Sequence, residues 1–294
     1  MLRFSAGYRV LRIIAALYAL TFVLLGCSSL TLAYDQGPRI AYWWIDRYLD
    51  LDASQGQQLR DATSEWFDWH RRTQLPDYAG LLVRAQGEVT SDVTPAQICA
   101  WVDVLLARGD VAVEHALPGL AEVMRTITPK QIEHLKQRYA KSNEDYRRDY
   151  LQSDAQERMK AQLKRVTERA QRLYGSLAPA QRDRLAQGLA ASPFDPQRYL
   201  EERERRQEDI VQTLVASRGA SSETMRARLA GVAHRLRHSP DASYEHYAQA
   251  LHTYNCQLAA QVHNAAPPAT RQAALARLKG WESDVRKLHA AAAQ

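Results

Sequence analysis

Two histidines, His234 and His238, have the spacing in this sequence that comes closest to a metal site. They lie four residues apart in the segment HRLRH, and on a helix this spacing places two imidazoles on one face. A zinc site needs at least a third protein ligand, and none lies nearby in the sequence. Arg235 and Arg237 would also repel a cation. We therefore expect a solvated helix face here and no bound metal.

A second group of reactive side chains lies in the segment EWFDWHRRTQLPDY, which begins at Glu65. On a helix, Trp66, Trp69 and His70 share one face, whereas Glu65 and Asp68 point largely elsewhere. The histidine and the acids therefore do not converge. The pattern favours a packed core with a polar rim over a catalytic site.

Motifs that would indicate an enzyme are otherwise missing from the sequence. It contains no nucleophile elbow, no phosphate-binding glycine loop and no paired-cysteine ligand motif. We therefore predict a protein that is not an enzyme and has no cofactor.

The beginning of the sequence, MLRFSAGYRVLRIIAALYALTFVLLGCSS, is typical of an export signal. Arg3, Arg9 and Arg12 precede an apolar run at residues 13–25, which ends in the small residue Gly26 and then Cys27. A basic head, a short apolar stretch and a small residue at the cleavage point define such signals. The run is short for a membrane-spanning helix. We therefore expect residues 1–26 to be a signal peptide.

The residues LLGC at positions 24–27 resemble the bacterial lipobox. This resemblance implies that Cys27 is acylated, that cleavage occurs just before it, and that residues 27–37 form a lipidated tether to the membrane. Two or three acyl chains give stable anchoring. Ser28 stands where an Asp would retain such lipoproteins at the inner membrane, which implies the periplasmic face of the outer membrane. The alternative is an uncleaved signal anchor with an incidental cysteine.

Charge argues against a nucleic-acid partner. The formal net charge of the chain is +6, and removal of the three signal arginines would lower it to +3. Acids and bases are also interleaved, as in RYLEERERRQED, a pattern typical of solvated helix faces. The polyanions that such a periplasmic protein would meet are anionic lipid and lipopolysaccharide.

With Cys27 lipidated, Cys99 and Cys256 remain as a pair. An oxidising compartment favours a disulfide between them, and closing so long a loop contributes on the order of 5 kcal/mol in the chain-entropy description. The alternative is two separate buried thiols.

Helices must position these residues, and the sequence marks their starts with a repeated phrase. ITPKQI begins at Ile127 and VTPAQI at Val93. Thr128 fits the N-cap, Pro129 the first helical position, and Gln131 the position that completes a capping box. The residues that fill these three roles in the other copy are Thr94, Pro95 and Gln97. This physical role accounts for the phrase without any chemistry.

Looser copies of the phrase occur elsewhere. Asp52 and Gln55 keep the cap and the glutamine but lack the proline, whereas Gln181 follows the poor capping residue Ala178. We interpret Ser153 with Gln156 as a plain Ser-x-x-Gln box. The intervals between copies are unequal, which excludes a solenoid of fixed period.

Helical periodicity and the lack of alternating strands predict an all-α fold, a multi-helix bundle of antiparallel and bent helical hairpins with no sheet. After Pro129, the chain contains neither Pro nor Gly up to Tyr174. These residues form either one long rod or two helices broken near Ser153. The box at Ser153 favours the break. Further helices are expected at residues 196–217, 222–238, 241–265 and 268–290.

The segment GLAASPFDPQ at residues 188–197 is the clearest interruption. It either separates two subdomains or is a turn inside one domain. A bridge between Cys99 and Cys256 would tie the two parts together, so we favour a single all-helical domain over residues 38–294.

The helix that Pro38 opens carries Ile40, Trp43, Trp44 and Tyr48 on its expected apolar face. We expect this aromatic face to pack under the bundle. The alternative is that it lies in the membrane interface, where Trp and Tyr are favourable.

Two stretches, AYWWIDRYLDLDASQ and NCQLAAQVHNAAPPATRQAALARLKGWESDVRKL, resemble an uncharacterised family of proteobacterial lipoproteins with a domain of unknown function. The resemblance implies a location and no activity.

The repeated phrase is also similar to the Leu-Thr-x-x-Gln hallmark of the periplasmic Spy/CpxP class. That resemblance implies an ATP-independent chaperone or an envelope-stress regulator with a concave client-binding face. This chain is longer and has Ile or Val at the first motif position.

These features together predict a lipid-anchored, non-catalytic helical binding protein of the bacterial envelope, chaperone-like or stress-related. The alternative is a structural or assembly partner of an outer-membrane complex. The sequence predicts a membrane contact through the lipid, and leaves the protein client and the oligomeric state open.

Overall fold

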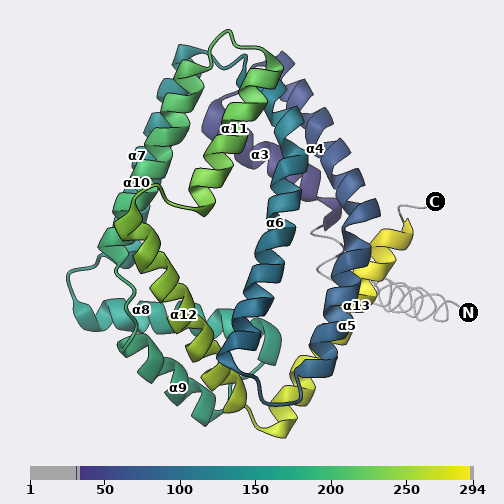
Figure 1. Cartoon of the computed structure of the whole chain (residues 1–294), viewed down its shortest axis with the longest axis vertical. Helices are drawn as coiled ribbons and strands as arrows, with labels where there is room; N and C mark the ends of the chain where they lie inside the picture. Colours follow the sequence, from purple (N-terminus) through teal and green to yellow (C-terminus); the bar gives the residue numbers. More distant parts are fainter. Residues whose placement is uncertain (1–30, 32–33, 292–294) are drawn as a thin grey trace, which may run out of the picture.

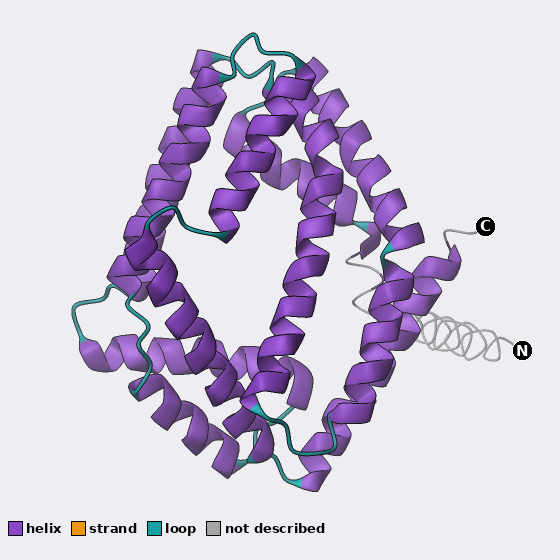
Figure 2. Ribbon diagram, viewed as in Figure 1, coloured by secondary structure: helices purple, strands orange, loops and turns teal. Residues whose placement is uncertain are grey.

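The structure, a computed structural model, describes residue 31 and residues 34–291. These residues form eleven helices and no strand (Figures 1 and 2). The predicted all-α class is therefore confirmed. The predicted lipidation site, Cys27, lies outside the described residues.

The helices keep the labels of Figure 1. Their bounds are α3 Gly37–Leu49, α4 Ala53–Thr73, α5 Leu75–Glu88, α6 Pro95–Met124, α7 Pro129–Tyr150, α8 Ala155–Tyr174, α9 Pro179–Ala190, α10 Pro196–Ala216, α11 Ser222–Arg237, α12 Ala242–Asn264 and α13 Pro268–Ala291.

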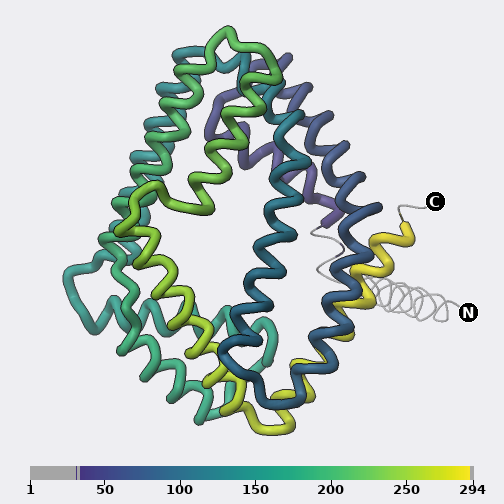
Figure 3. Tube along the Cα trace, in the orientation of Figure 1, coloured from purple at the N-terminus to yellow at the C-terminus, as the bar shows by residue number. Residues whose placement is uncertain are grey.

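Helix α6 runs through the middle of the molecule and connects its two ends (Figure 1). At one end it packs against α4 and α11, and at the other end against α12. Helices α7 and α10 lie side by side, and α8, α9 and α12 form the opposite end. The last helix, α13, returns along α5, so segments far apart in the sequence are neighbours (Figure 3).

The main core lies where α3, α6, α7, α10 and α11 meet. Its buried residues are Leu49, Ala121, Ile127, Ile132, Leu135, Val211, Leu214 and Met225. Ile127 and Ile132 flank the start of α7 in the positions of a hydrophobic staple, and both lie inside this core. A separate cluster joins α8, α9 and α12, and two smaller ones join α5 to α13.

Three helices begin with a complete capping box. At α7, Thr128 N–H donates to Gln131 Oε1 at 2.9 Å and Gln131 N–H donates to Thr128 Oγ1 at 3.3 Å. The same reciprocal bonds join Thr94 to Gln97 at α6 and Asp52 to Gln55 at α4. At α9 only half of the box forms, because the Ala178 side chain has no acceptor.

The box that we assigned to Ser153 is wrong. Asp154 is the N-cap of α8, and its Oδ1 accepts from the amides of Gln156 and Glu157. A carboxylate at this position satisfies two free amides and carries the negative charge that a helix N-terminus favours. The predicted break itself is present, since α7 ends at Tyr150 and α8 begins at Ala155.

Three of the capping glutamines also connect distant segments. Gln131 Nε2 donates to Asp50 O at 2.9 Å and to Gln55 Oε1 at 2.6 Å. Gln55 Nε2 in turn donates to Thr126 O at 3.0 Å, and Gln181 Nε2 to Val262 O at 3.3 Å. Each oxygen caps its own helix while the amide group bonds elsewhere, which explains why these three glutamines are buried.

The expected apolar face of α3 is wrong. Ile40, Trp43 and Trp44 are 55%, 57% and 58% exposed. Of the expected face, Tyr48 packs against the main core, together with Ile45 and Leu49. Both sets fit helical spacing, because α3 carries two adjacent apolar stripes. The stripe of Ile45, Tyr48 and Leu49 faces the core, and the two tryptophans remain exposed.

Candidate functional site

The middle of α6 exposes apolar side chains to an unusual extent. Leu105 is 59% exposed, Leu106 and Val111 are each 40% exposed, and Val113 is 46% exposed. Buried residues of this 30-residue helix are confined to its last third, at Leu117, Ala121 and Val123. We call these four side chains the α6 patch.

The α6 patch covers more than one face of the helix. Leu106 and Val113 lie two turns apart on nearly the same face, whereas Val111 lies on a different side. A soluble helix normally hides one apolar stripe and exposes a polar one. The middle of α6 is apolar on several sides, so a partner that covers it would bury surface that the fold leaves open.

Polar contacts at its sides hold α6 in place near the patch. Trp101 Nε1 donates to Glu88 Oε2 at 2.7 Å, and the Arg84 guanidinium lies 4.5 Å from the Trp101 ring centre. Arg108 forms an ion pair with Asp77 of α5. These contacts join the helices through long side chains, which keeps the helix backbones apart and leaves the apolar side chains uncovered.

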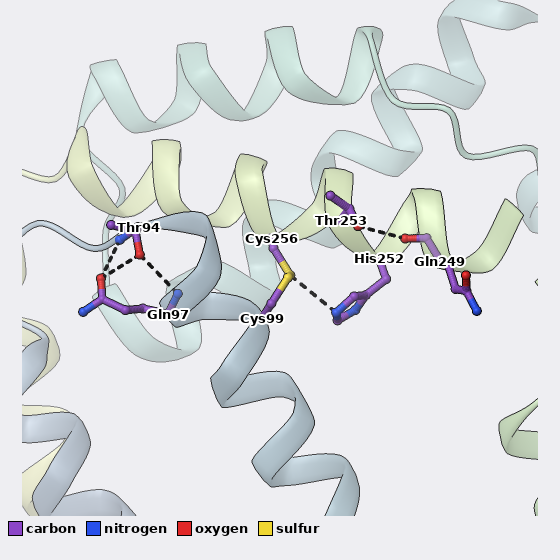
Figure 4. The surroundings of a disulfide bond; sticks show 7 residues. All are labelled: Thr94, Gln97, Cys99, Gln249, His252, Thr253 and Cys256. Atoms are coloured by element: carbon purple, nitrogen blue, oxygen red, sulfur yellow. Dashed lines mark hydrogen bonds between the residues drawn. A yellow bond between two sulfur atoms is a disulfide. The ribbon is translucent and has the colours of Figure 1, made fainter. Parts of the chain in front are cut away.

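The start of α6 is joined to α12 by a disulfide. Cys99 and Cys256 are bonded, with Cα atoms 5.5 Å apart, as the sequence predicted. His252 lies one turn before Cys256, with its Nε2 3.7 Å from Cys256 Sγ (Figure 4). The Thr94–Gln97 capping box lies next to the disulfide, at the N-terminal end of α6 (Figure 4).

Cys99, His252 and Cys256 bring three potential metal-binding atoms within 4.8 Å of one another. Both sulfur atoms are committed to the disulfide, and a thiolate is the form that binds metal. The bonded form is therefore a covalent link between two helices. His234 and His238 have ring centres 5.3 Å apart, and His238 Nδ1 pairs with Glu245 Oε1 at 3.4 Å. Among the described residues, these side chains do not bring three ligand atoms within 4.8 Å of one another.

The aromatic cluster around His70 packs in the interior. Its ring stacks on Trp66 with centres 4.8 Å apart, and Nδ1 lies 2.8 Å from the Tyr34 hydroxyl. Burial lowers the pKa of His70, which favours the neutral ring at neutral pH. Trp69 stacks on His115 at 3.7 Å. The acids Glu65 and Asp68 are exposed and do not converge on the histidine.

A cavity of about 470 Å³ lies between α3, α6, α7, α10 and α11, next to the main core. We call it the core cavity. Its wall is mostly aliphatic, with Ile45, Leu120, Met124, Ile210 and Leu229 among the residues that form it. This volume falls in the range of about 300–1,000 Å³ that is typical of small-molecule sites.

Few polar groups line the core cavity. The charged ones are Arg203 and Arg206 of α10, with no Asp or Glu among the lining residues. Tyr48 and Tyr139 also line it, with ring centres 6.0 Å apart. Burial raises the pKa of Tyr139 to about 12, so its hydroxyl stays protonated and can donate a hydrogen bond.

The predicted site residues thus separate into two groups. Cys99 and Cys256 meet, and the box residues Thr94, Pro95 and Gln97 lie at the same end of α6. Thr128, Pro129 and Gln131 lie at the other end of the molecule, beside the main core.

Sequence reasoning missed the α6 patch and the core cavity. The α6 patch had a signal, because the run VDVLLARGDVAV is apolar on several sides of a helix. The core cavity had no local signal, since its walls come from five helices spread over the chain.

Comparison with known protein families identifies the family of this chain. The profile described as "Family of unknown function (DUF6279)" matches residues 47–240. No curated protein and no solved structure gives a significant match. Among the described helices, none is both long and apolar enough to cross a membrane.

Proposed function

The chain belongs to the DUF6279 family of unknown function, and we propose that it is a non-catalytic, lipid-anchored binding protein of the bacterial envelope. Its clients are protein segments that expose apolar side chains, and the α6 patch is the surface that holds them. The observation that carries this proposal is the exposure of Leu105, Leu106, Val111 and Val113 in the middle of α6.

Physical chemistry supports a weak, general binder at this surface. Apolar contact has no direction and scales with the area that is covered, so it tolerates many client sequences. The α6 patch offers four aliphatic side chains, interspersed with the exposed acids Asp103, Asp110 and Glu114. Binding of this kind needs no nucleotide, in keeping with the resemblance to the ATP-independent Spy/CpxP class.

The envelope location rests on the sequence and on one structural feature. The signal-like residues 1–26, Cys27 and Ser28 support a lipid anchor at the periplasmic face of the outer membrane. The disulfide between Cys99 and Cys256 supports an oxidising compartment, because such bonds are rare in the cytosol.

A variant with Leu105→Gln and Leu106→Gln tests the client surface. We expect the wild-type chain to suppress aggregation of a chemically denatured protein at a stoichiometric ratio without nucleotide, and the double variant to lose most of this suppression. Val215→Gln is the matched control, because Val215 is 50% exposed on α10, away from the patch. No suppression by the wild type at several-fold excess would rule out the proposal.

Acylation is tested separately. We expect Cys27→Ser to abolish lipid attachment and to leave the precursor uncleaved, as judged by mass spectrometry of membrane fractions. Normal processing of this variant would contradict the lipobox assignment without affecting the client surface.

A second candidate function is supported by the exposed face of α3. Ile40, Trp43 and Trp44 form an apolar, aromatic surface, and aromatic residues are enriched in protein interfaces. This favours a structural or assembly partner of an outer-membrane complex. A photo-crosslinker at position 43 distinguishes the two in living cells: one dominant partner supports assembly, whereas many partners support general client binding.

A further inference from the structure

Arg203 carries a charge that has no acidic partner in the described part of the chain. Its Nε donates to Asn143 Oδ1 at 2.9 Å, and its Nη2 donates to Ser142 Oγ. Both acceptors are neutral. The side chain is partly buried and lines the core cavity. A cation removed from water without a counter-charge is unfavourable, so this position favours an anion brought by a ligand.

The neighbouring charges do not neutralise Arg203. Arg206, the other charged residue of the core cavity, donates from Nε to Glu202 Oε1 at 2.8 Å. Glu202 also binds Arg205, with both carboxylate oxygens engaged. Glu204 pairs with Arg147 on the outer side of α10. Each nearby carboxylate is thus engaged with another arginine.

Two phenol groups add hydrogen-bond donors to the same cavity. Tyr139 and Tyr48 line the core cavity, and neither hydroxyl is hydrogen-bonded to another described residue. Burial raises the pKa of Tyr139 to about 12, and the positive charge of Arg203, which lines the same cavity, acts in the opposite direction. The guanidinium and the two phenol hydroxyls can all donate hydrogen bonds, and such a set suits an oxyanion.

The rest of the core cavity suits a hydrocarbon chain. Ile45, Leu120, Met124, Ile210 and Leu214 supply aliphatic wall. Trp44, which is 58% exposed, also belongs to the lining, so the cavity reaches the surface beside α3. A ligand therefore has an apolar interior and a way in from outside.

We propose that the core cavity binds a single-chain anionic amphiphile. The acyl chain lies against Ile45, Leu120 and Ile210, and the head group, a carboxylate or a phosphate, accepts hydrogen bonds from Arg203 and Tyr139. This inference goes beyond the proposed client binding on the α6 patch and does not depend on it.

Native mass spectrometry of the full chain in a non-ionic detergent tests the proposal. The probes are palmitate, palmitoyl lysophosphatidate and the uncharged analogue hexadecanol. We expect one bound molecule per chain for palmitate or the lysophosphatidate, and binding of hexadecanol at least about tenfold weaker, because it lacks the charge-assisted hydrogen bonds. The two anionic probes show which head group is preferred.

Arg203→Gln is expected to weaken binding of the anionic probe by about tenfold or more, and to leave hexadecanol binding unchanged. Arg147→Gln is the control, because this arginine is exposed and faces outward. Ile210→Trp keeps Arg203 and fills the acyl site, so it should weaken all three probes. Circular dichroism verifies that each variant remains helical.

Several results would overturn the proposal. These are the absence of any bound probe, equal affinity for palmitate and hexadecanol, or wild-type affinity in a helical Arg203→Gln variant. Tighter binding of a two-chain phosphatidate would refute the single-chain assignment. The Leu105→Gln, Leu106→Gln variant should bind palmitate as the wild type does, so failure of client binding and failure of amphiphile binding are distinguishable.

Discussion

Two helix starts with nearly the same sequence, VTPAQI at α6 and ITPKQI at α7, lie in very different surroundings. Both form a complete capping box. Gln131 is buried and its amide reaches Asp50 and Gln55. Gln97 is exposed, and its side chain and amide bond to Thr94 of its own box.

Each helix start is fixed to the rest of the molecule by a different means. The α7 start is held by the glutamine pair and by Ile127 and Ile132 in the main core. The α6 start is held by the bond between Cys99 and Cys256. Capping therefore explains where these helices begin, whereas stability depends on what surrounds the cap.

Loss of the disulfide should have the largest effect on the α6 start. The bond closes a sequence separation of 157 residues, and its removal should lower the free energy of unfolding by on the order of 5 kcal/mol in the chain-entropy description. Urea unfolding of the oxidised protein and of a Cys99→Ser, Cys256→Ser variant measures this difference. Equal midpoints would mean that the α6 start has another strong attachment.

Gln131→Ala should cost about 2–3 kcal/mol, because it removes half of a capping box and the two hydrogen bonds that the buried Gln131 amide donates to Asp50 O and Gln55 Oε1. Thermal and urea unfolding would measure the loss. Its matched control is Gln97→Ala, which exposes the freed groups to water and should cost about 0.5 kcal/mol. Similar losses for the two variants would contradict the comparison.

Thr94→Ala and Thr128→Ala sharpen the comparison, because they alter only the cap. Each removes one side-chain acceptor from the first turn, so each should cost about 1 kcal/mol despite the different surroundings. The same unfolding measurements apply. A much larger cost at Thr128 would show that its hydroxyl also supports the main core.

The smallest expected difference between the α6 start and the α7 start is in how their stability depends on pH. His263, near the α6 start, lies 2.8 Å from both the Tyr174 hydroxyl and Ser91 O, and burial lowers its pKa below 6.5. As the pH falls, His263 is therefore protonated in the unfolded chain before it is protonated in the folded protein. The stability that depends on it is fully present above about pH 6.5 and falls as the pH drops toward the folded-state pKa.

A His263→Gln variant should reduce that acid sensitivity. Unfolding midpoints between neutral and mildly acidic pH measure this sensitivity. Amide hydrogen exchange should rise more on acidification in the segment before Thr94 than around Thr128. An unchanged pH profile in the variant would assign the acid sensitivity to another group, such as His70.

Features that depend on a few consecutive residues could be predicted from the sequence. The boxes at Thr94 and Thr128 were identifiable because cap and glutamine lie three residues apart. The disulfide was identifiable because only Cys99 and Cys256 remained once Cys27 was assigned to lipid. Asp154 was missed because it stands beside a serine that fits the same pattern.

Features that depend on distant packing could not be predicted. The face that α3 buries was ambiguous, since Trp43 and Trp44 fit helical spacing as well as Ile45 and Leu49 do. The isolation of Arg203 depends on which arginines engage Glu202 and Glu204, and those contacts are set by the packing of α7 against α10 and by rotamers along α10.

Fixing both ends of α6 has a mechanical consequence. A helix that is attached by a covalent bond at Cys99 and by the core near Ala121 is restrained from moving as a rigid body when a partner binds to its middle. Force applied to the intervening turns is transmitted along the rod to both anchorages. A client bound to the middle of α6 should therefore affect both attachments, near Cys99 and near Ala121, without contacting either of them.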